Sequence, residues 1–358
     1  MRFIREILAE IQWYVVSLLA LLAASVWLLN SVSAPVSNSA KPVRVTIPIG
    51  SSAGEVASML SEAGLVRSST AFVFTLRMRR ESERLKPGEY ELRPNMSLVQ
   101  IIRTLVRGRS ASASITIPEG YTIPQIARLL AANRIVNERA FLDAALQQAF
   151  RFSDMVPVAS NSLEGYLFPD TYQFPRRTDC DFVIRGILAV FYDKVQKPLG
   201  REIAGSHLDA FLVATPEGDA HGRKLFAVLT LASLVEEEAK TDKDRKLISS
   251  VLHNRLRKGM PLQVDATVQY ALGGHRRLYN HDYDTPSAYN TYLYKGLPPG
   301  PIASPGLKSI TAAMRPARSD YLYYVAGKGG AHIFSRTLEE HNRAKAAAQQ
   351  ARQREQAQ

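Results

Sequence analysis

The feature of this sequence that most constrains its fold is an apolar segment that ends on three acidic residues. Nine of the eleven residues from Leu225 to Val235 are apolar, and Glu236, Glu237 and Glu238 follow at once. A surface helix carries an apolar stripe along one side, whereas this segment is apolar all round. The pattern predicts a helix that is buried on most sides and ends on carboxylates. Such carboxylates are candidates for acid catalysis, because burial and neighbouring negative charge raise a carboxyl pKa.

The composition bounds the partners of the chain without identifying them. A length of 358 residues leaves room for two or three compact modules, and the formal net charge of +12 weakly indicates an anionic partner. The single cysteine, Cys180, excludes an intramolecular disulfide. The seven histidines show no paired spacing typical of metal ligands. We therefore expect no metal and no cofactor.

The N-terminal segment predicts a membrane anchor. Residues 13–29 carry no charge, and with their flanks they approach the length of about 20 residues that spans a bilayer, so we place a transmembrane helix at 13–32. Arg2 and Arg5 precede it, which places residues 1–12 in the cytoplasm and the body of the chain on the other side of the membrane. A cleaved signal peptide is the alternative. Outside the cytoplasm we expect an acidic envelope polymer or lipid headgroups as partners, and no nucleic acid.

An internal repeat organises the region that follows. The stretch "VTIPIGSSAGEVASMLSEAGLV" from Val45 aligns with "ITIPEGYTIPQIARLLAANRIV" from Ile115 at an offset of 70 residues. Each copy opens with alternating apolar residues, which predict a strand, and continues with a capping box that predicts the start of an amphipathic helix. The capping boxes are Ser52 with Glu55 and Thr122 with Gln125. The residues alone do not reject the alternative that the repeat is a duplicated packing unit.

The two copies are expected to end differently. In the first, a helix at about 69–80 and a strand in "KPGEYEL" (86–92), with Tyr90 and Leu92 on one face, complete a β-α-α-β unit. This order resembles the LysM-type glycan-binding module. In the second, "SLEGYLFPDTYQF" (162–174) sets aromatic residues beside two carboxylates. That stretch suits a sugar site, because aromatic faces stack on pyranose rings, or alternatively an edge strand with buried rings.

The downstream half is predicted to combine helices with one hairpin. "RKLISSVLHNRLRKG" places its apolar residues on one helical face before a stop at Gly259. "YDTPSAYNTYLYKGLPPGPIASPG" is dense in Tyr, Asn, Pro and Gly, which is typical of an ordered loop that carries function. "YLYYVA" and "AHIFS" predict a hairpin, and the Ala/Gln/Arg-rich end predicts a frayed helix or a disordered tail. We therefore expect an α+β fold.

Several of these stretches together resemble one protein family closely. They are "ASLVEEEA", "LEGYLFPDTY", "NRLRKGMPLQVDATVQYALG", "TPSAYNTYLYKGLPPGPIASPG" and "YLYYVAGKGGAHIFS". Taken together they are similar to the endolytic murein transglycosylases of the YceG-like family, and the similarity covers nearly the whole chain. The resemblance implies a lyase that cuts peptidoglycan glycan strands internally and leaves a 1,6-anhydro-muramyl end. Such enzymes are thought to terminate nascent strands beside the peptidoglycan synthesis machinery.

The resemblance also implies a location and a domain organisation. We expect a single-pass protein of the inner membrane whose catalytic body lies in the periplasm. The predicted parts are a cytoplasmic N-terminus (1–12), a transmembrane helix (13–32), a linker (33–42), a LysM-like module (43–108), a mixed α+β catalytic domain (109–340) that contains the second repeat copy (115–175), and a flexible tail (341–358).

The resemblance places the catalytic glutamate first after "ASLV", at Glu236, although the family usually has lysine where this chain has Glu237. One such carboxyl is sufficient for a lytic transglycosylase, because the 6-hydroxyl of the muramyl residue attacks its own C1 and no water is activated. On the residues alone, solvated glutamates with Lys240 paired to Glu236 are the alternative. Candidates for binding substrate or stabilising positive charge are Glu164, Asp265, Tyr289, Asn290 and Tyr292.

Other activities remain open at this point. A hydrolytic muramidase needs a second carboxylate, for which Glu164 or Asp265 is a candidate. A scaffold that binds peptidoglycan without cutting it would leave glycan strands intact. A nucleic-acid binder fits the charge of the chain, but no motif supports it.

Overall fold

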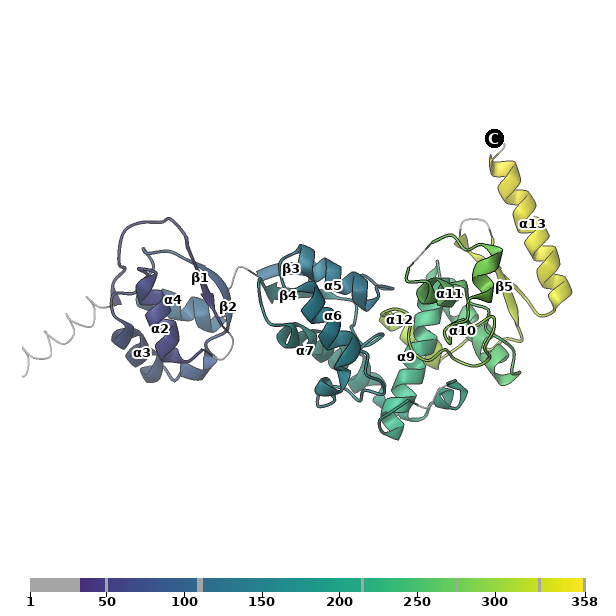
Figure 1. Ribbon diagram of the computed structural model, residues 1–358, viewed down its shortest axis with the longest axis horizontal. Coiled ribbons are helices and arrows are strands. Elements are labelled where there is room, and N and C mark those ends of the chain that lie inside the picture. The colour runs from purple at the N-terminus through teal and green to yellow at the C-terminus, as the bar shows by residue number, and fades with distance from the viewer. Residues whose placement is uncertain are drawn as a thin grey trace, which may run out of the picture. The chain divides into compact units, whose positions relative to one another are not determined.

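The computed structural model describes residues 33–48, 51–107, 112–213, 216–274, 276–327 and 330–356. The chain divides into a first unit, residues 1–113 with 173–178, and a second unit, residues 114–172 with 179–358. Helices prevail in the described residues, and three small two-stranded sheets accompany them (Figure 1). The predicted α+β class is confirmed.

The predicted transmembrane helix, 13–32, lies outside the described residues. Within the part of the chain that the structure describes, we find no helix that is both long enough and apolar enough to cross a bilayer.

The first unit has the β-α-α-β order that the first repeat copy predicts. Its elements are β1 (Val43–Ile47), α2 (Ala53–Glu62), α3 (Ser69–Met78), β2 (Gly88–Leu92) and α4 (Leu98–Arg107). The strands pair antiparallel, with Val43 opposite Leu92. The capping box forms as predicted, because Ser52 N donates to Glu55 Oε2 at 2.7 Å and Glu55 N donates to Ser52 Oγ at 3.3 Å. Tyr90 and Leu92 are both buried in the core of this unit.

The second copy repeats this order and closes with a strand of its own. Its elements are β3 (Ser112–Thr116), α5 (Ile123–Ala132), α6 (Glu138–Gln147) and β4 (Thr171–Pro175). β3 pairs with β4, and the division between the two units falls inside these strands. The aromatic stretch 162–174 was open to two interpretations, and the buried one is correct: the side chains of Tyr166, Phe168, Tyr172 and Phe174 all lie in the core. These rings are therefore not a surface on which sugars stack.

The remaining helices and the predicted hairpin complete the second unit. They are α7 (Cys180–Phe191), α8 (Lys197–Ala204), α9 (Ala220–Glu238), α10 (Asp242–Arg257), α11 (Asp265–Ala271), α12 (Leu307–Met314), the antiparallel pair β5 (Tyr323–Ala326) and β6 (His332–Ser335), and α13 (Leu338–Gln356). A π-helical turn, Tyr192–Gln196, joins α7 to α8. α13 includes most of the predicted tail, which is helical as far as Gln356.

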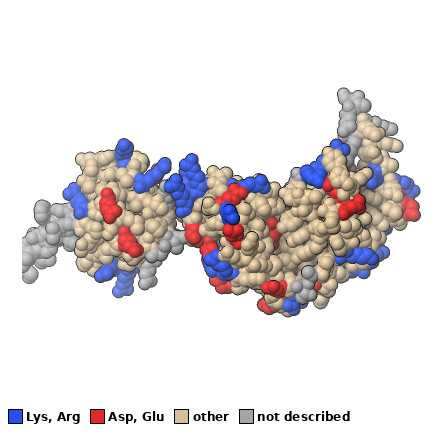
Figure 2. Space-filling view, viewed as in Figure 1, with Lys and Arg blue, Asp and Glu red and all other residues tan. Residues whose placement is uncertain are grey.

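Charged side chains are mixed over the surface. On the face shown in Figure 2, Lys and Arg side chains are spread over both units and stand among Asp and Glu side chains. The basic surplus of the chain is thus distributed over this face.

Candidate active site

α9 runs through the interior of the second unit. All eleven residues from Leu225 to Val235 are buried, with at most 2% of any of them exposed. The helix begins at the cap Asp219, whose Oδ1 accepts a hydrogen bond from Gly222 N at 2.6 Å. α8, α10, α11 and α12 pack around it. The prediction of a helix buried on most sides is confirmed, and the three glutamates form its last turn.

Glu236 is held by two partners. Its Oε1 pairs with Nη1 of Arg245 at 2.8 Å, and its Oε2 accepts a hydrogen bond from the backbone N–H of Gly306 at 2.9 Å. Gly306 is the residue that caps α12. The side chain of Glu236 is 7% exposed. These two contacts occupy both carboxyl oxygens of Glu236 and tie the end of α9 to α10 and α12.

Arg245 connects several carboxylates. Besides Glu236, its guanidinium contacts Asp242 Oδ1 at 3.1 Å and Glu119 Oε2 at 3.8 Å. Nη1 also donates to the hydroxyl of Ser309 in α12. Partial burial raises the pKa of Glu119, and the negative charge of Glu236 adds to that effect. The site therefore concentrates negative charge around one arginine.

Glu238 lies among phenol groups and another carboxylate. The Tyr324 hydroxyl is a hydrogen-bond partner of Glu238, and the charge of Asp265 acts on it. Asp265 Oδ1 in turn accepts a hydrogen bond from the Tyr292 hydroxyl at 2.5 Å. Burial, with the charge of Asp265, raises the pKa of Glu238 to about 7. This carboxyl can therefore exchange a proton near neutral pH.

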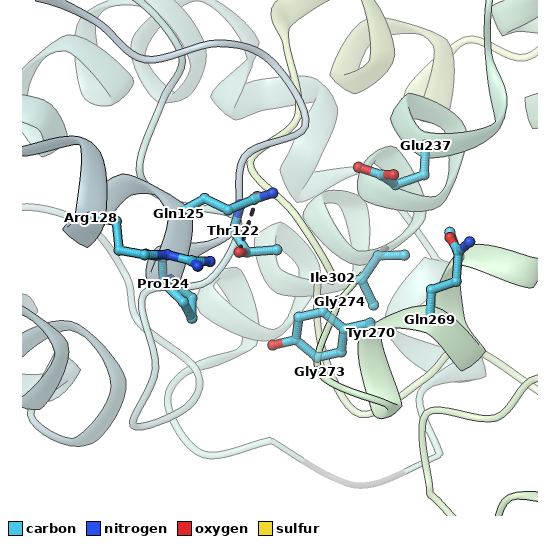
Figure 3. Close-up of a pocket in the computed structure, with 11 residues that line it drawn as sticks. Thr122, Pro124, Gln125, Arg128, Glu237, Gln269, Tyr270, Gly273, Gly274 and Ile302 are labelled. Atoms are coloured by element: carbon cyan, nitrogen blue, oxygen red, sulfur yellow. Dashed lines mark hydrogen bonds between the residues drawn. The ribbon is translucent and has the colours of Figure 1, made fainter. Parts of the chain in front are cut away.

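Glu237 lines a pocket with an empty volume of about 510 Å³. The start of α5, helix α11 with the two glycines that follow it, and Ile302 form the other walls (Figure 3). Burial and the charges of Glu236 and Glu238 raise the pKa of Glu237 to about 7. The turn before α5 also comes close, since a Cβ built on Gly120 would lie 3.1 Å from Glu237 Oε1.

Glu164 is buried beneath this pocket rather than in it. Only 4% of it is exposed, and both its carboxyl oxygens accept from Ile123 N, at 3.1 and 3.2 Å. The hydroxyl of Tyr270, a residue of the pocket wall, lies 3.5 Å from Oε2. Burial raises the pKa of Glu164 to about 8. These contacts give Glu164 a supporting position behind the wall.

The other predicted binding residues fall into two groups. Asp265 and Tyr292 lie with Glu238, as described above. The Tyr289 ring packs on Tyr270 with 4.9 Å between centroids, and so it stands behind the pocket wall as well. Asn290 is fully buried, and its amide donates to the carbonyls of Tyr283 and Thr285, at 2.8 and 2.9 Å. Its contacts are those of a residue that shapes the loop.

With this geometry in hand, the chain can be compared with known proteins. The model of the YceG-like family matches residues 45–347. The chain belongs to the YceG-like family. An endolytic murein transglycosylase of Bacillus subtilis is 35% identical over 331 residues, which are 88% of each chain. One of Streptococcus pneumoniae is 33% identical over 337 residues, which are 86% of this chain and 58% of that relative.

A solved structure gives the same assignment. The crystal structure of a yceG-like protein from Listeria monocytogenes, at 2.6 Å resolution, is 33% identical in sequence. It aligns with a TM-score of 0.56 over 85% of this chain and 98% of that one. The family resemblance found in the sequence is thus confirmed.

Sequence reasoning missed three participants of this YceG-like site. Arg245 lies in "KTDKDRK", where nothing distinguishes it from its charged neighbours. Tyr324 was expected in a hairpin, but the alternation of a short strand does not say which distant residue each side chain meets. Tyr270 follows "VQ" in an otherwise ordinary helix. The three gain their place from tertiary contacts, for which the local pattern carries no signal.

Proposed function

We propose that the chain is an endolytic peptidoglycan lytic transglycosylase, and so a lyase. It would cleave the β-1,4 bond between MurNAc and GlcNAc within nascent glycan strands and leave a 1,6-anhydro-MurNAc end. The relatives from Bacillus subtilis and Streptococcus pneumoniae carry the name endolytic murein transglycosylase. The observation that carries the proposal is the carboxyl group at the end of a buried helix whose pKa is raised to about 7, beside a second carboxylate and two phenols.

One carboxyl serves both halves of this reaction. In the protonated form it donates its proton to the glycosidic oxygen as the bond between C1 and that oxygen breaks. The 6-hydroxyl of the same muramyl residue then bonds to C1, and its proton passes to the carboxylate. The carboxyl is regenerated, and no water or cofactor is consumed. A pKa near the working pH suits a group that both donates and accepts.

The assignment of this role to Glu236 stays a prediction from the family resemblance, and the contacts support a different division of roles. Both oxygens of Glu236 are occupied, one by Arg245 and the other by the backbone N–H of Gly306, so its contacts are those of a group that holds helices together. Glu238 has a raised pKa and neighbours suited to a cationic transition state. We therefore propose Glu238 as the proton carrier and Glu236 as the partner of Arg245 and Gly306 that fixes the end of α9.

The neighbours of Glu238 supply the electrostatics. Positive charge develops at C1 as the glycosidic bond breaks, and a fixed negative group close by stabilises it. Asp265, held by the Tyr292 hydroxyl, is placed for this role beside Glu238. Of the five predicted binding residues, Asp265 and Tyr292 are retained here, whereas Glu164, Tyr289 and Asn290 act as supports of the site.

The location of the enzyme is also part of the proposal. We propose a single-pass anchor at 13–32 in the inner membrane, with the body in the periplasm beside the peptidoglycan synthesis machinery. The residues 43–108 would form a LysM-like module that holds glycan, and 109–340 the catalytic domain. The strand and helix order of the first unit supports the module, and the uncharged run at 13–29 supports the anchor.

A hydrolytic muramidase is the second candidate, and one observation favours it. Asp265 stands beside Glu238, and two carboxylates at one site are what a hydrolase uses. Glu164 does not suit the same role, because it is buried against the backbone of Ile123. The products separate the two activities: a lytic transglycosylase leaves anhydro ends, and a muramidase leaves reducing ends.

The test uses purified full-length chain and long glycan strands, with mass spectrometry of the ends produced. Glu238→Gln keeps the shape of the side chain but removes the transferable proton, so we expect a loss of rate of at least ~10²–10⁴-fold. Glu236→Gln removes half of an ion pair, so we expect lower stability and a smaller loss of rate. Wild-type activity should fall as the pH rises above about 7, because Glu238 must start protonated.

Circular dichroism and thermal melting show whether each variant is folded, and Glu339→Gln in the exposed first turn of α13 is the matched control. If folded Glu236→Gln makes no anhydro ends while Glu238→Gln does, the proton carrier is Glu236. Reducing ends from the wild type would establish the muramidase, and intact strands would leave only a binding scaffold.

A further inference from the structure

The pocket beside Glu237 has no part in the proton transfer described above. Its walls combine apolar surface with a few polar and charged side chains, which is typical of small-ligand sites. Glu237 is the chain neighbour of Glu238, so the pocket opens one residue away from the proposed proton carrier. A group bound here would belong to the same substrate that Glu238 cleaves.

An acidic and a basic side chain stand at the two ends of this pocket. Glu237 extends into it from the end of α9, and Arg128 of α5 lies at the opposite end (Figure 3). The Arg128 side chain is exposed, and its Nε donates to Pro124 O at 3.2 Å, which directs the guanidinium along the first turn of α5. Burial and the charges of Glu236 and Glu238 raise the pKa of Glu237 to about 7, and an ammonium group bound beside Glu237 would favour its ionised form.

The space between the charges is lined by apolar surface and amides. The Tyr270 ring and Ile302 lie between the two ends in Figure 3, and the side-chain amides of Gln125 and Gln269 border them. Gln125 is fixed, since its Oε1 accepts from Thr122 N at 2.8 Å. Gly273, with a φ of +84°, and Gly274 follow α11 and add no side chains to that wall of the pocket. The lining thus suits a short chain with an apolar body and polar groups.

We propose that this pocket is a subsite for the peptide stem of peptidoglycan, with Glu237 binding a free amine and Arg128 binding a carboxylate of the same stem. The inference rests on the proposed function, because it assumes that a peptidoglycan strand lies across the end of α9. Cleavage of the glycosidic bond does not by itself require recognition of the amino-acid part of the polymer, and this subsite would add that recognition.

Charge complementarity selects the stem over the sugars. The amino groups of the glycan sugars are acetylated and neutral, so a sugar in this pocket would offer no charged group that complements Glu237 or Arg128. A peptide stem carries both an amine and carboxylates on a short chain. Matched pairs at both ends of a pocket fix the direction in which a ligand binds as well as its presence.

The experiment compares two forms of the same long strands: strands with intact stems, and strands from which an amidase has removed the stems. KM and kcat for the release of anhydro ends are measured with the full-length chain. One well-placed charge pair corresponds to about tenfold in affinity. We therefore expect the wild type to cut both strands, with a KM about tenfold lower for the stemmed ones.

The variants test which residues make that difference. In Glu237→Gln the ratio of the two KM values should fall from about ten towards one, and in Arg128→Gln it should fall less, because Arg128 is exposed. Glu339→Gln, far from the pocket in sequence and exposed in α13, should keep the wild-type ratio. Calorimetric titration with the released stem peptide should show binding to the wild type and weaker binding to Glu237→Gln.

The outcomes separate this inference from the proposed function. If the wild type cuts neither strand, the proposed function fails and the subsite with it. If the wild type cuts both strands with equal KM, or if Glu237→Gln keeps the wild-type ratio of KM values, the subsite is wrong and the lytic activity stands.

Discussion

The two copies of the internal repeat share a fold and differ in what lies against them. In the first unit, β1, α2, α3 and β2 enclose a core together with α4. In the second copy, the turn between β3 and α5 reaches the end of α9: Gly120 N donates to Ser304 O at 2.9 Å, and Glu119 approaches Arg245. The second copy thus contributes to the candidate active site through the turn between β3 and α5 and through the start of α5.

Equivalent positions show how little has to change. At the offset of 70 residues, Ser58 corresponds to Arg128. In the first copy the Ser58 hydroxyl bonds back to Gly54 O at 3.2 Å, so this position serves only its own helix. In the second copy the same helical position lines the pocket. The apolar positions that the copies share maintain the fold, whereas the polar positions determine whether a copy takes part in the pocket.

The largest expected difference between the copies is a pH dependence of stability that comes from Glu164. Burial raises its pKa to about 8 in the folded chain, so its contribution is fully present below pH 4.5 and is lost as the pH rises through about 8. Between pH 5 and 8 the free energy of unfolding should therefore fall by up to about 4 kcal/mol. Urea titrations at four pH values should show that Glu164→Gln removes this slope.

The control for that prediction lies in the first copy. Glu62 is exposed in α2, and Glu62→Gln should leave the dependence of unfolding free energy on pH as it is in the wild type. An unchanged slope in Glu164→Gln would mean that Glu164 is ionised and solvated in the folded chain.

A smaller effect is expected from removing the first copy. Deleting 43–108 while keeping 1–42 should weaken cleavage of long strands by roughly tenfold, because a tethered second binding module raises the effective concentration of the strand. Cleavage of short strands and the circular dichroism of the remaining helices are the readouts. Undiminished cutting of long strands, or unfolding of the remainder, would contradict the proposal that 43–108 holds glycan while 109–340 cleaves it.

The smallest effect concerns the turn that ends the first helix of each copy. Gly64 and Arg134 are equivalent, and both have positive φ, at 66° and 59°. Both turns also carry matching hydrogen bonds, Leu65 N to Leu60 O and Ile135 N to Leu130 O. Since this conformation favours glycine, Arg134→Gly should raise stability by about 1 kcal/mol and Gly64→Ala should lower it by a similar amount. Scanning calorimetry should therefore show shifts of opposite sign, and shifts of equal sign would contradict the strain assigned to Arg134.

Periodicity in the sequence was sufficient to predict α9, both repeat copies and the β5–β6 hairpin, because these depend on local patterns of apolar residues. It was not sufficient for the site. Glu236 was predicted from its position after "ASLV", but its partner Arg245 comes from the next helix and Gly306 from a distant loop. The burial of Glu164 was equally invisible, because the backbone N–H of Ile123 that meets its carboxyl lies far away in the sequence.

The burial of α9 on every side also limits how its sequence can change over time. A helix such as α5, which buries one face through Ile123, Ile126, Ala127 and Leu130, can accept many substitutions on the other as the chain diverges. The stretch from Leu225 to Val235 has no such tolerant face, since every replacement alters the packing against some neighbour. The helix that delivers the carboxylates is therefore a segment in which few substitutions can accumulate without a cost in stability.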